Sequence, residues 1–380
     1  MELILKQYDI PLLRFSATND SSTPEIEVHW INEDQRHLLP LDMELSPEGI
    51  SRWMRRRTIP RNRAYVNRLL AKCGLNANRP MGILSLCKGL SVDDSYWVVE
   101  EGFEGTFEKY NLFENRFSEV LALIAFTGYG SSNRSSLASS PEFTTNGMLP
   151  KCWRRISGKV TLYKGGTDGG YNTGAEPYCE YYAAQIAAVM GIDAIPYGLS
   201  QWKGRLCSTC ELFTDIDHAY MPIGNLVQRG GFDAVATYYE KLGEPFQKAF
   251  RDMLVFDAVI CNTDRHYGNF GFMIDNKTNT IATPAPLFDH GNSLFNQAGP
   301  EDYESPEAFQ QYIDTLVPCV YDDFFATAKR FMADENREQL RKLLGFRFKR
   351  HVRYNLPPKR LKLMEEQVRK RAMRLLENKE

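Results

Sequence analysis

The residues best suited to chemistry lie in two short polar runs, one around Asn269 and one around Asp289. Between them, the sequence predicts a strand over 270–274, a turn at 275–279 and a second strand that runs to 286. Because a hairpin brings its two ends together, Asn269 and Asp289 are expected to face the same point. Amide and carboxylate oxygens suit Mg²⁺ that is shared with substrate phosphates. The pattern therefore predicts a site for magnesium and a phosphorylated ligand, with Asn269 and Asp289 as metal ligands.

Asp264 lies five residues before Asn269. This is the interval between the proton-accepting Asp and the metal-binding Asn in the catalytic loop of protein kinases, and Asp289 begins an Asp-x-Gly run of the kinase metal-binding form. The order of the three residues indicates phosphoryl transfer with Asp264 as the base. Each piece also has a structural interpretation, because an isolated Asp264 could cap a loop and an isolated Asp-x-Gly is usually a turn.

Phosphoryl transfer also needs a cation for the phosphates and an acid that orients it. Lys164, at the end of a predicted strand, is the candidate cation, with Glu180 as its expected partner and Glu176 as the second choice. Lys151 is either a further phosphate contact or an exposed strand lysine. The segment that could cradle phosphates through its backbone N–H groups is Thr144, Thr145, Asn146 and Gly147.

The predicted elements around these residues are a strand pair, a helix and a second helix. Strands are expected over 149–156 and 159–164 around Ser157-Gly158, followed by a flexible connection at 165–170. The spacing of apolar residues predicts a helix over 176–190, ended by Gly191. A further strand is expected to end at 210–213. An amphipathic helix precedes Asn262, with Phe246, Phe250, Met253, Leu254 and Asp257 at helical spacing.

The chain has 380 residues, 43% hydrophobic residues and a net charge of −2. This composition excludes a largely disordered or fibrous protein, and no apolar run is long enough to span a membrane. The Ser- and Gly-rich residues 128–146 predict a linker or an approach to a phosphate loop. The predicted domains are therefore an N-terminal accessory domain of unknown role at 1–127, a kinase N-lobe at 147–215 and a helical C-lobe at 216–380.

The balanced charge conceals two basic stretches. Residues 337–380 carry fifteen Lys or Arg and five Glu, and residues 52–72 carry eight Lys or Arg and no acid. The second stretch, after a predicted helix start at Ser46-Pro47-Glu48, either contacts nucleic-acid phosphates or pairs with acidic residues elsewhere, and pairing is favoured. Cys207 and Cys210 lack a second cysteine pair, so buried thiols are favoured over zinc. Reduced thiols without an export signal suggest a cytoplasmic protein.

Two further runs carry a family resemblance. Asn262-Thr263-Asp264-Arg265-His266-x-x-Asn269 and Ala285-Pro286-Leu287-Phe288-Asp289 together resemble the HipA-like serine/threonine kinases, most closely the CtkA-type branch. Cys179 to Ala184 looks like the helix that faces ATP in that family. The resemblance covers roughly residues 144–300, whereas residues 1–127 match no HipA N-terminal domain.

The resemblance implies an α+β, two-lobed protein-kinase-like fold with an added N-terminal domain, which binds ATP and Mg²⁺ and phosphorylates a protein on Ser or Thr. Asp264 would be the base, Lys164 would hold phosphates, and His266 would shape the loop or take part in the chemistry. The backbone around Glu211, Leu212 and Phe213 would contact adenine. Self-phosphorylation is frequent in the family, which makes candidates of Ser131, Ser132, Ser135, Ser136, Ser139 and Ser140.

Two other functions remain open at this point. Phosphoinositide-type lipid kinases share the Asp-Arg-His-x-x-Asn pattern, and the basic C-terminal stretch could approach anionic lipid. A nucleotide-binding regulator could instead use residues 52–72 to contact DNA, with catalysis lost. The complete set of Lys164, Asp264, Asn269 and Asp289 argues against the regulator, and no membrane-binding helix supports the lipid kinase.

Overall fold

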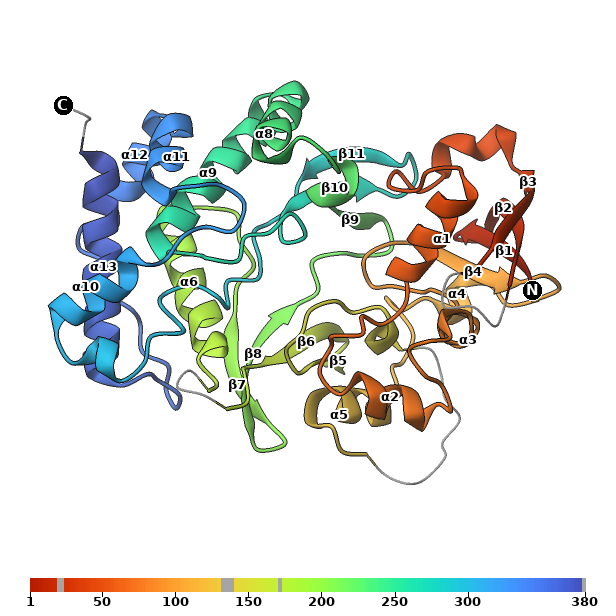
Figure 1. Ribbon diagram of the computed structural model, residues 1–380, viewed down its shortest axis with the longest axis horizontal. Helices are drawn as coiled ribbons and strands as arrows, with labels where there is room; N and C mark the ends of the chain where they lie inside the picture. The colour runs from red at the N-terminus through yellow and green to blue at the C-terminus, as the bar shows by residue number, and fades with distance from the viewer. Residues whose placement is uncertain (19–23, 131–139, 170–172, 378–380) are drawn as a thin grey trace. The chain divides into compact units, whose positions relative to one another are not determined.

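The computed structural model describes residues 1–18, 24–130, 140–169 and 173–377 (Figure 1). The chain forms two compact units. Unit 1 comprises residues 1–164, 211–221 and 273–282, and unit 2 comprises 165–210, 222–272 and 283–380. Both units contain helices and strands, which confirms the predicted α+β class. The predicted domain limits at 127, 146 and 215 stay a prediction; residues before 128 and the strand pair that follows 150 both belong to unit 1.

The first sheet of unit 1 is antiparallel and has the order β3-β2-β1-β4. Alternate residues of β1 such as Leu3 and Leu5 are buried, as expected for a sheet with one covered face. They share a core with Ile50 and Trp53 of α1, which begins at Ser46 as predicted: the Ser46 Oγ accepts the N–H of Gly49. The strands are β1 (Glu2–Gln7), β2 (Ile10–Ala17), β3 (Ile26–Ile31) and β4 (Tyr96–Glu100).

Two smaller groups of strands complete unit 1. Strands β5 (Lys151–Ile156) and β6 (Lys159–Gly165) form the predicted hairpin, and both turn residues, Ser157 and Gly158, have positive φ as a two-residue turn requires. A three-stranded sheet has the order β11-β10-β9, with β9 at His218–Pro222, β10 at Gly271–Asp275 and β11 at Thr280–Pro284. The short helices are η1 (Glu33–Leu38), α1 (Pro47–Arg56), α2 (Val66–Lys72), α3 (Pro80–Cys87), α4 (Phe107–Tyr110), α5 (Glu119–Thr127) and η2 (Pro141–Phe143).

Unit 2 is mainly helical. Helix α9 (Glu244–Ile260) is its centre and contacts α6, α8, α11 and α13. Of the five residues predicted at helical spacing, Phe250, Met253, Leu254 and Asp257 are buried, whereas Phe246 is half-buried. Helix α6 spans Glu176–Met190 and ends at Gly191, as the sequence predicts. The other elements are β7 (Gly198–Trp202), β8 (Arg205–Glu211), α7 (Ile223–Leu226), α8 (Gly231–Leu242), η3 (Glu301–Tyr303), α10 (Pro306–Asp314), α11 (Phe324–Phe331), α12 (Asp334–Arg341) and α13 (Pro358–Leu376).

Acidic residues within unit 1 pair with half of the cations of the basic stretch 52–72. Arg57 binds both carboxylate oxygens of Asp94 at 2.7 Å, and Arg63 forms a fully buried ion pair with Glu142. The more exposed Arg56 and Arg52 pair with Asp42 and Glu44. The favoured interpretation, pairing with acidic residues, therefore describes half of the eight cations and reduces the charge that this stretch could offer to DNA.

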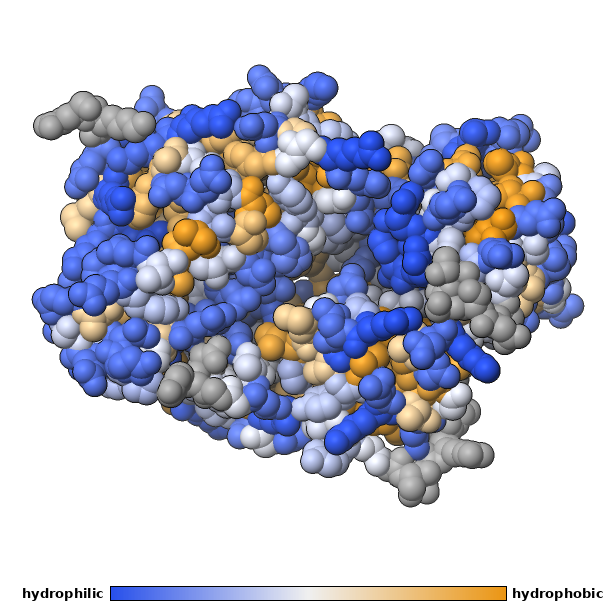
Figure 2. Space-filling model, viewed as in Figure 1, coloured by the Kyte–Doolittle hydropathy of each residue, from blue (hydrophilic) through white to orange (hydrophobic). Residues whose placement is uncertain are grey.

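The surface is mostly hydrophilic on the face that Figure 2 draws, and the cysteines are free thiols. Figure 2 shows hydrophilic side chains over most of the face it draws, with hydrophobic side chains in scattered groups. All eight cysteines are free thiols, and Cys207 is buried. Within the described ranges, no group of three or more His, Cys, Asp or Glu residues could hold a metal ion. None of the helices described is long and apolar enough to cross a membrane.

Candidate active site

The loop that carries Asp264 is tied to the end of α9. Cys261 ends the helix in a left-handed conformation, with φ of 54°. The buried Asn262 then links the two parts: its Nδ2 donates to Asp257 Oδ1 at 3.1 Å, and its Oδ1 accepts the N–H of Asp264 at 3.1 Å. The position of Asp264 is therefore fixed by the helix that precedes it.

The carboxylate of Asp264 is oriented by Asn292. Asn292 Nδ2 donates to Asp264 Oδ2 at 2.9 Å, and Asn296 Nδ2 donates to Asn292 Oδ1 at 3.0 Å, which sets the amide orientation. Asp264 is half-buried. With Oδ2 engaged, Oδ1 of Asp264 is the oxygen that is suited to accept a proton from a substrate hydroxyl. Asn292 lies three residues after Asp289 in the sequence, and its role was not predicted.

Asn269 lies at the other end of the same loop. Its side chain is 7% exposed, its N–H donates to the carbonyl of His266 at 2.9 Å, and its Nδ2 donates to the carbonyl of Asp264 at 3.4 Å. An amide that donates through Nδ2 presents its Oδ1 in another direction. This oxygen is the atom of Asn269 that would bind a metal ion.

Arg265 joins the two ends of the predicted hairpin. Its Nη1 donates to the carbonyl of Asn269 at 3.1 Å and to the carbonyl of Phe288, next to Asp289, at 2.5 Å. The guanidinium is 1% exposed and forms a two-point ion pair with Asp257 of α9, at 2.9 and 3.1 Å. Burial alone would lower the pKa of Arg265, but the Asp257 carboxylate outweighs burial and raises it. A permanently charged Arg265 thus holds Asn269 and Asp289 together.

Asp289 follows a short extended segment that is anchored on both sides. The N–H of Leu287 donates to the carbonyl of Asp193, and the carbonyl of Leu287 accepts the N–H of Ile195. Asp289 has a φ of 54°, and its N–H donates to the hydroxyl oxygen of Tyr197 at 3.1 Å. Burial, together with the charges of Glu180 and Asp289, raises the pKa of Tyr197 well above its ordinary value, so this hydroxyl stays protonated. The segment places Asp289 by backbone contacts.

The two acidic candidates on α6 have different surroundings. Glu180 is fully buried and its Oε2 accepts the N–H of His290 at 2.8 Å, one residue after Asp289. Glu176 accepts the N–H and the hydroxyl of Thr167 in the glycine-rich connection. Glu180 thus contacts the backbone of the run that begins at the predicted metal ligand Asp289. Its pairing with Lys164, which belongs to unit 1, stays a prediction.

His266 has an exposed ring whose Nδ1 accepts the N–H of Gly268 at 3.0 Å. A ring nitrogen that accepts a backbone N–H is occupied in shaping the loop. The contact supports the architectural role over direct chemistry.

Unit 1 contains the predicted phosphate-contacting residues. Lys151 and Lys164 lie directly opposite each other in the β5–β6 hairpin, and each is 6% exposed. The alternative that Lys151 is an exposed strand lysine is therefore wrong. Lys151 Nζ donates to the carbonyl of Asn146 at 2.8 Å, and a Cβ added at Gly147 would lie 2.2 Å from that nitrogen. With a φ of 90°, Gly147 is suited to this place by conformation and by space.

The hydroxyls of Thr144 and Thr145 are used to hold the loop itself. Thr144 Oγ1 donates to the carbonyl of Leu90 at 3.0 Å. Thr145 Oγ1 donates to the carbonyl of Pro141 at 2.7 Å and accepts Trp153 Nε1–H at 3.0 Å. Any phosphate contact from this loop would therefore come from its backbone, as the sequence predicted.

A buried ion pair that the sequence did not predict supports this loop. Arg63 and Glu142 have fully buried side chains; Arg63 Nη2 also donates to the carbonyl of Lys151 at 3.0 Å, and Glu142 Oε1 accepts the N–H of Trp153 at 2.8 Å. Burial raises the pKa of Glu142, and Arg63 opposes that rise. The only sequence signal was the position of Arg63 in the basic stretch, which suggested a surface residue.

The predicted adenine-contacting segment leaves β8 at Glu211. The N–H of Leu212 donates to the carbonyl of Val160 in β6 at 2.9 Å, which places this segment beside that strand in unit 1. The Glu211 carboxylate pairs with exposed Lys159, and the Phe213 ring packs edge-on against Tyr220 at 5.5 Å. Contact with adenine through the backbone stays a prediction.

The candidate self-phosphorylation sites mostly fall in residues 131–139, outside the described residues. Ser140 is described and is 1% exposed; its Oγ accepts the N–H of Glu142 at the start of η2. In this arrangement Ser140 is a buried helix cap.

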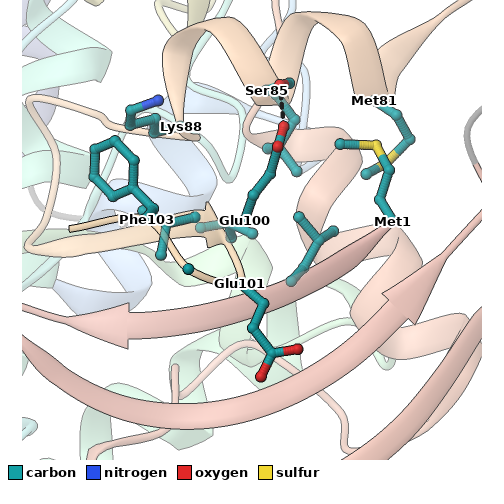
Figure 3. A pocket seen from close by; sticks show the side chains of 12 residues that line it. Met1, Met81, Ser85, Lys88, Glu100, Glu101 and Phe103 are labelled. Atoms are coloured by element: carbon teal, nitrogen blue, oxygen red, sulfur yellow. Dashed lines mark hydrogen bonds between the residues drawn. The ribbon is translucent and has the colours of Figure 1, made fainter. Parts of the chain in front are cut away.

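A cavity of about 300 Å³ lies apart from these residues, between β1, α3 and β4 (Figure 3). Met1 and Met81 line its apolar side, and Ser85 Oγ donates to Glu100 Oε1 at 2.6 Å. None of the predicted site residues lines this cavity.

Comparisons with known proteins agree with the resemblance. No family model matches the chain. A curated relative, the serine/threonine-protein kinase CtkA of Helicobacter pylori strain J99, is 27% identical over 135 residues, which cover 32% of this chain and 41% of the relative. The chain thus matches about two fifths of the length of that relative, so the activity of the whole protein is not carried over by this match alone.

Two solved structures are similar in fold. HipA of Shewanella oneidensis MR-1, solved with HipB and operator DNA, aligns with a TM-score of 0.53 and 13% identity over 98% of this chain and 97% of its own. The H. pylori proinflammatory kinase CtkA aligns with a TM-score of 0.48 and 16% identity over 61% of this chain and 90% of its own. The likeness to HipA includes residues before 128, for which the sequence indicated no relation. The match to the curated relative confirms the resemblance to the CtkA-type branch, and the alignment with HipA confirms the HipA-like fold.

Proposed function

From a HipA-like fold and sequence similarity to a CtkA-type kinase, we propose that this protein transfers the γ-phosphoryl group of ATP to a Ser or Thr hydroxyl of a protein. The observation that carries the proposal is the joint placement of Asp264, Asn269 and Asp289 in unit 2. Asn292 orients the first of them, and Arg265 binds the chain at the other two. This is the donor set that phosphoryl transfer requires.

The polar oxygens at this place fit magnesium bound with a nucleotide. Asn269 and Asp289 are two hard oxygen donors, too few for a metal site made by protein alone, and Mg²⁺ usually completes its shell with phosphate oxygens and water. When bound, Mg²⁺ would neutralise charge that develops on the transferred group. The use of ATP and Mg²⁺ is part of the proposal.

The chain's own groups would then act by position and by proton transfer. Asp264 Oδ1 would accept the hydroxyl proton of the substrate as its oxygen attacks phosphorus, while Oδ2 stays bound to Asn292. Lys164 and Lys151 would bind phosphate oxygens, and the segment 211–213 would contact adenine. Glu180 would keep Lys164 protonated and oriented.

The rival functions have less support. Four arginines of the stretch 52–72 are bound to carboxylates, which weakens the case for a DNA-binding regulator.

A cytoplasmic location accords with eight free thiols and stays a prediction. Self-phosphorylation within 131–140 also stays a prediction.

The test is incubation with radiolabelled ATP and Mg²⁺, with a protein mixture and separately with phosphoinositide. Label on protein Ser or Thr, located by mass spectrometry, is the expected result. Asp264→Asn and Asp289→Ala should each abolish labelling while the thermal unfolding midpoint stays unchanged. Label in lipid alone, or full activity in either variant, would overturn the proposal.

A further inference from the structure

The C-terminal part of unit 2 contains a stretch with no acidic residue. From Gln339 to Met364 the chain has nine Lys or Arg and no Asp or Glu. Its centre, residues 346–355 between α12 and α13, is called here the basic turn. The basic turn carries four exposed cations, Arg347, Lys349, Arg350 and Arg353. None of the four pairs with a carboxylate among the residues that the structure describes.

The first half of the basic turn projects its cations by alternation. Phe346 and Phe348 are buried, and the Phe348 ring lies 4.6 Å from that of Tyr182 in α6. Arg347 and Lys349 occupy the alternate positions and are exposed, as an extended segment with one buried face requires. The aromatic residues thus serve as anchors, and the cations form the solvent side.

In the second half the chain reverses direction in a turn that is held by hydrogen bonds. The side chain of Asn355 binds both backbone groups of His351: its Oδ1 accepts the His351 N–H at 2.9 Å and its Nδ2 donates to the His351 carbonyl at 2.6 Å. His351 Nδ1 accepts the N–H groups of Arg353 and Tyr354. Gln185 of α6 binds both backbone groups of Lys349. The charges are therefore presented on a fixed backbone.

At the tip of this reversal stands Val352, which is 92% exposed. It is flanked by Arg350 and Arg353. Exposure of an aliphatic side chain to water is unfavourable. Its transfer into the apolar region just below a layer of anionic head groups would be favourable.

We propose that the basic turn docks onto an anionic lipid bilayer. Val352 would enter the boundary between head groups and acyl chains, and Arg347, Lys349, Arg350 and Arg353 would bind lipid phosphates. A single-stranded nucleic acid fits less well, because single strands are held by stacking on open aromatic rings. Here Phe346 and Phe348 are buried, and His351 is stacked on Tyr354 at 5.3 Å. This surface contact is independent of the proposed kinase activity and requires no spanning segment.

The test is sedimentation of the full chain with vesicles of phosphatidylcholine alone, or with 30% phosphatidylglycerol, in the absence of ATP. Binding is expected only to the anionic vesicles at 0.1 M salt and should disappear at 1 M salt, where the screening length is about 3 Å. Arg350→Glu with Arg353→Glu should weaken binding at least about 25-fold, from about fivefold for each cation lost. Val352→Asp should also weaken it.

A matched control reverses two exposed cations elsewhere, Arg79→Glu with Lys203→Glu. Both double variants bring the formal net charge from −2 to −6, so a difference between them reports position and not total charge. Circular dichroism melting verifies that each variant is folded. Failure to bind anionic vesicles, equal loss in the control, or binding of a labelled DNA duplex through Arg350 and Arg353 in place of vesicles would overturn the proposal.

Discussion

Asn292 donates a hydrogen bond of 2.9 Å to Oδ2 of Asp264, across 28 residues of sequence. The bond joins the run that starts at Asp289 to the loop that carries the proposed base. It occupies Oδ2 and leaves Oδ1 for the proposed proton transfer, so the orientation of the proposed base depends on a residue outside its own loop.

Asn292→Ala should lower kcat about 10- to 100-fold, because Asp264 would lose the partner that orients it. The KM for ATP should change little, since Asn292 is not expected to touch the nucleotide. Steady-state kinetics with a Ser-containing protein substrate measures both. Asn292→Asp, which places a second carboxylate against Oδ2, should be worse than Ala; if it were better, the orienting role would be wrong.

Arg265→Leu should destabilise unit 2 by about 3–5 kcal/mol, because it leaves the buried Asp257 carboxylate without its partner. Urea unfolding followed by fluorescence measures the loss. The exposed pair of Arg341 and Glu338 provides the control: Arg341→Leu should cost no more than about 1 kcal/mol. Comparable losses in the two variants would contradict a central role for Arg265.

Gly147→Ala should weaken the binding of ATP by about tenfold, because the new Cβ would occupy the place of Lys151 Nζ and the backbone would be strained at positive φ. Isothermal titration with a non-hydrolysable ATP analogue measures the affinity. Gly158→Ala, also at positive φ but with nothing near its added Cβ, is the control for strain alone. An unchanged affinity in Gly147→Ala would remove this loop from the nucleotide site.

The raised pKa of Asp93 leads us to expect that the stability of the fold depends on pH. Burial, with the neighbouring charge of Asp94, raises the pKa of Asp93 to about 6. Between the unfolded pKa near 4 and this value, the folded state binds a proton that the unfolded state lacks, so this residue adds stability as the pH falls from about 7 to 5. In Asp93→Asn that contribution disappears. The test measures the unfolding free energy of both proteins at pH 7.5 and 5.5. The change in unfolding free energy from pH 7.5 to 5.5 should be more positive for the native chain than for Asp93→Asn.

The sequence alone determined the local elements and the chemistry of the donor set. The helix over 176–190, the hairpin around Ser157-Gly158 and the inner face of α9 follow from residue spacing and turn residues, which act over a few positions. The sequence also showed Asp264, Asn269 and Asp289 in the order found in kinases. It predicted the hairpin between Asn269 and Asp289, and a hairpin brings its two ends together.

Tertiary structure decided which partners hold those residues. Arg63 looked like a surface cation in a basic run but is buried against Glu142, because the pairing spans 79 residues and leaves no local pattern. The sequence left open whether Lys151 is an exposed strand residue or a phosphate contact. In the folded chain Lys151 is buried, which no local pattern indicated. Arg265 stands in a motif that the sequence showed and Asn292 follows Asp289 by three residues. Their bonds to Asp264, Asn269 and Phe288 depend on how distant segments pack. Spacing specifies residues that are neighbours along the chain, whereas orientation of a catalytic group comes from contacts that only the folded chain makes.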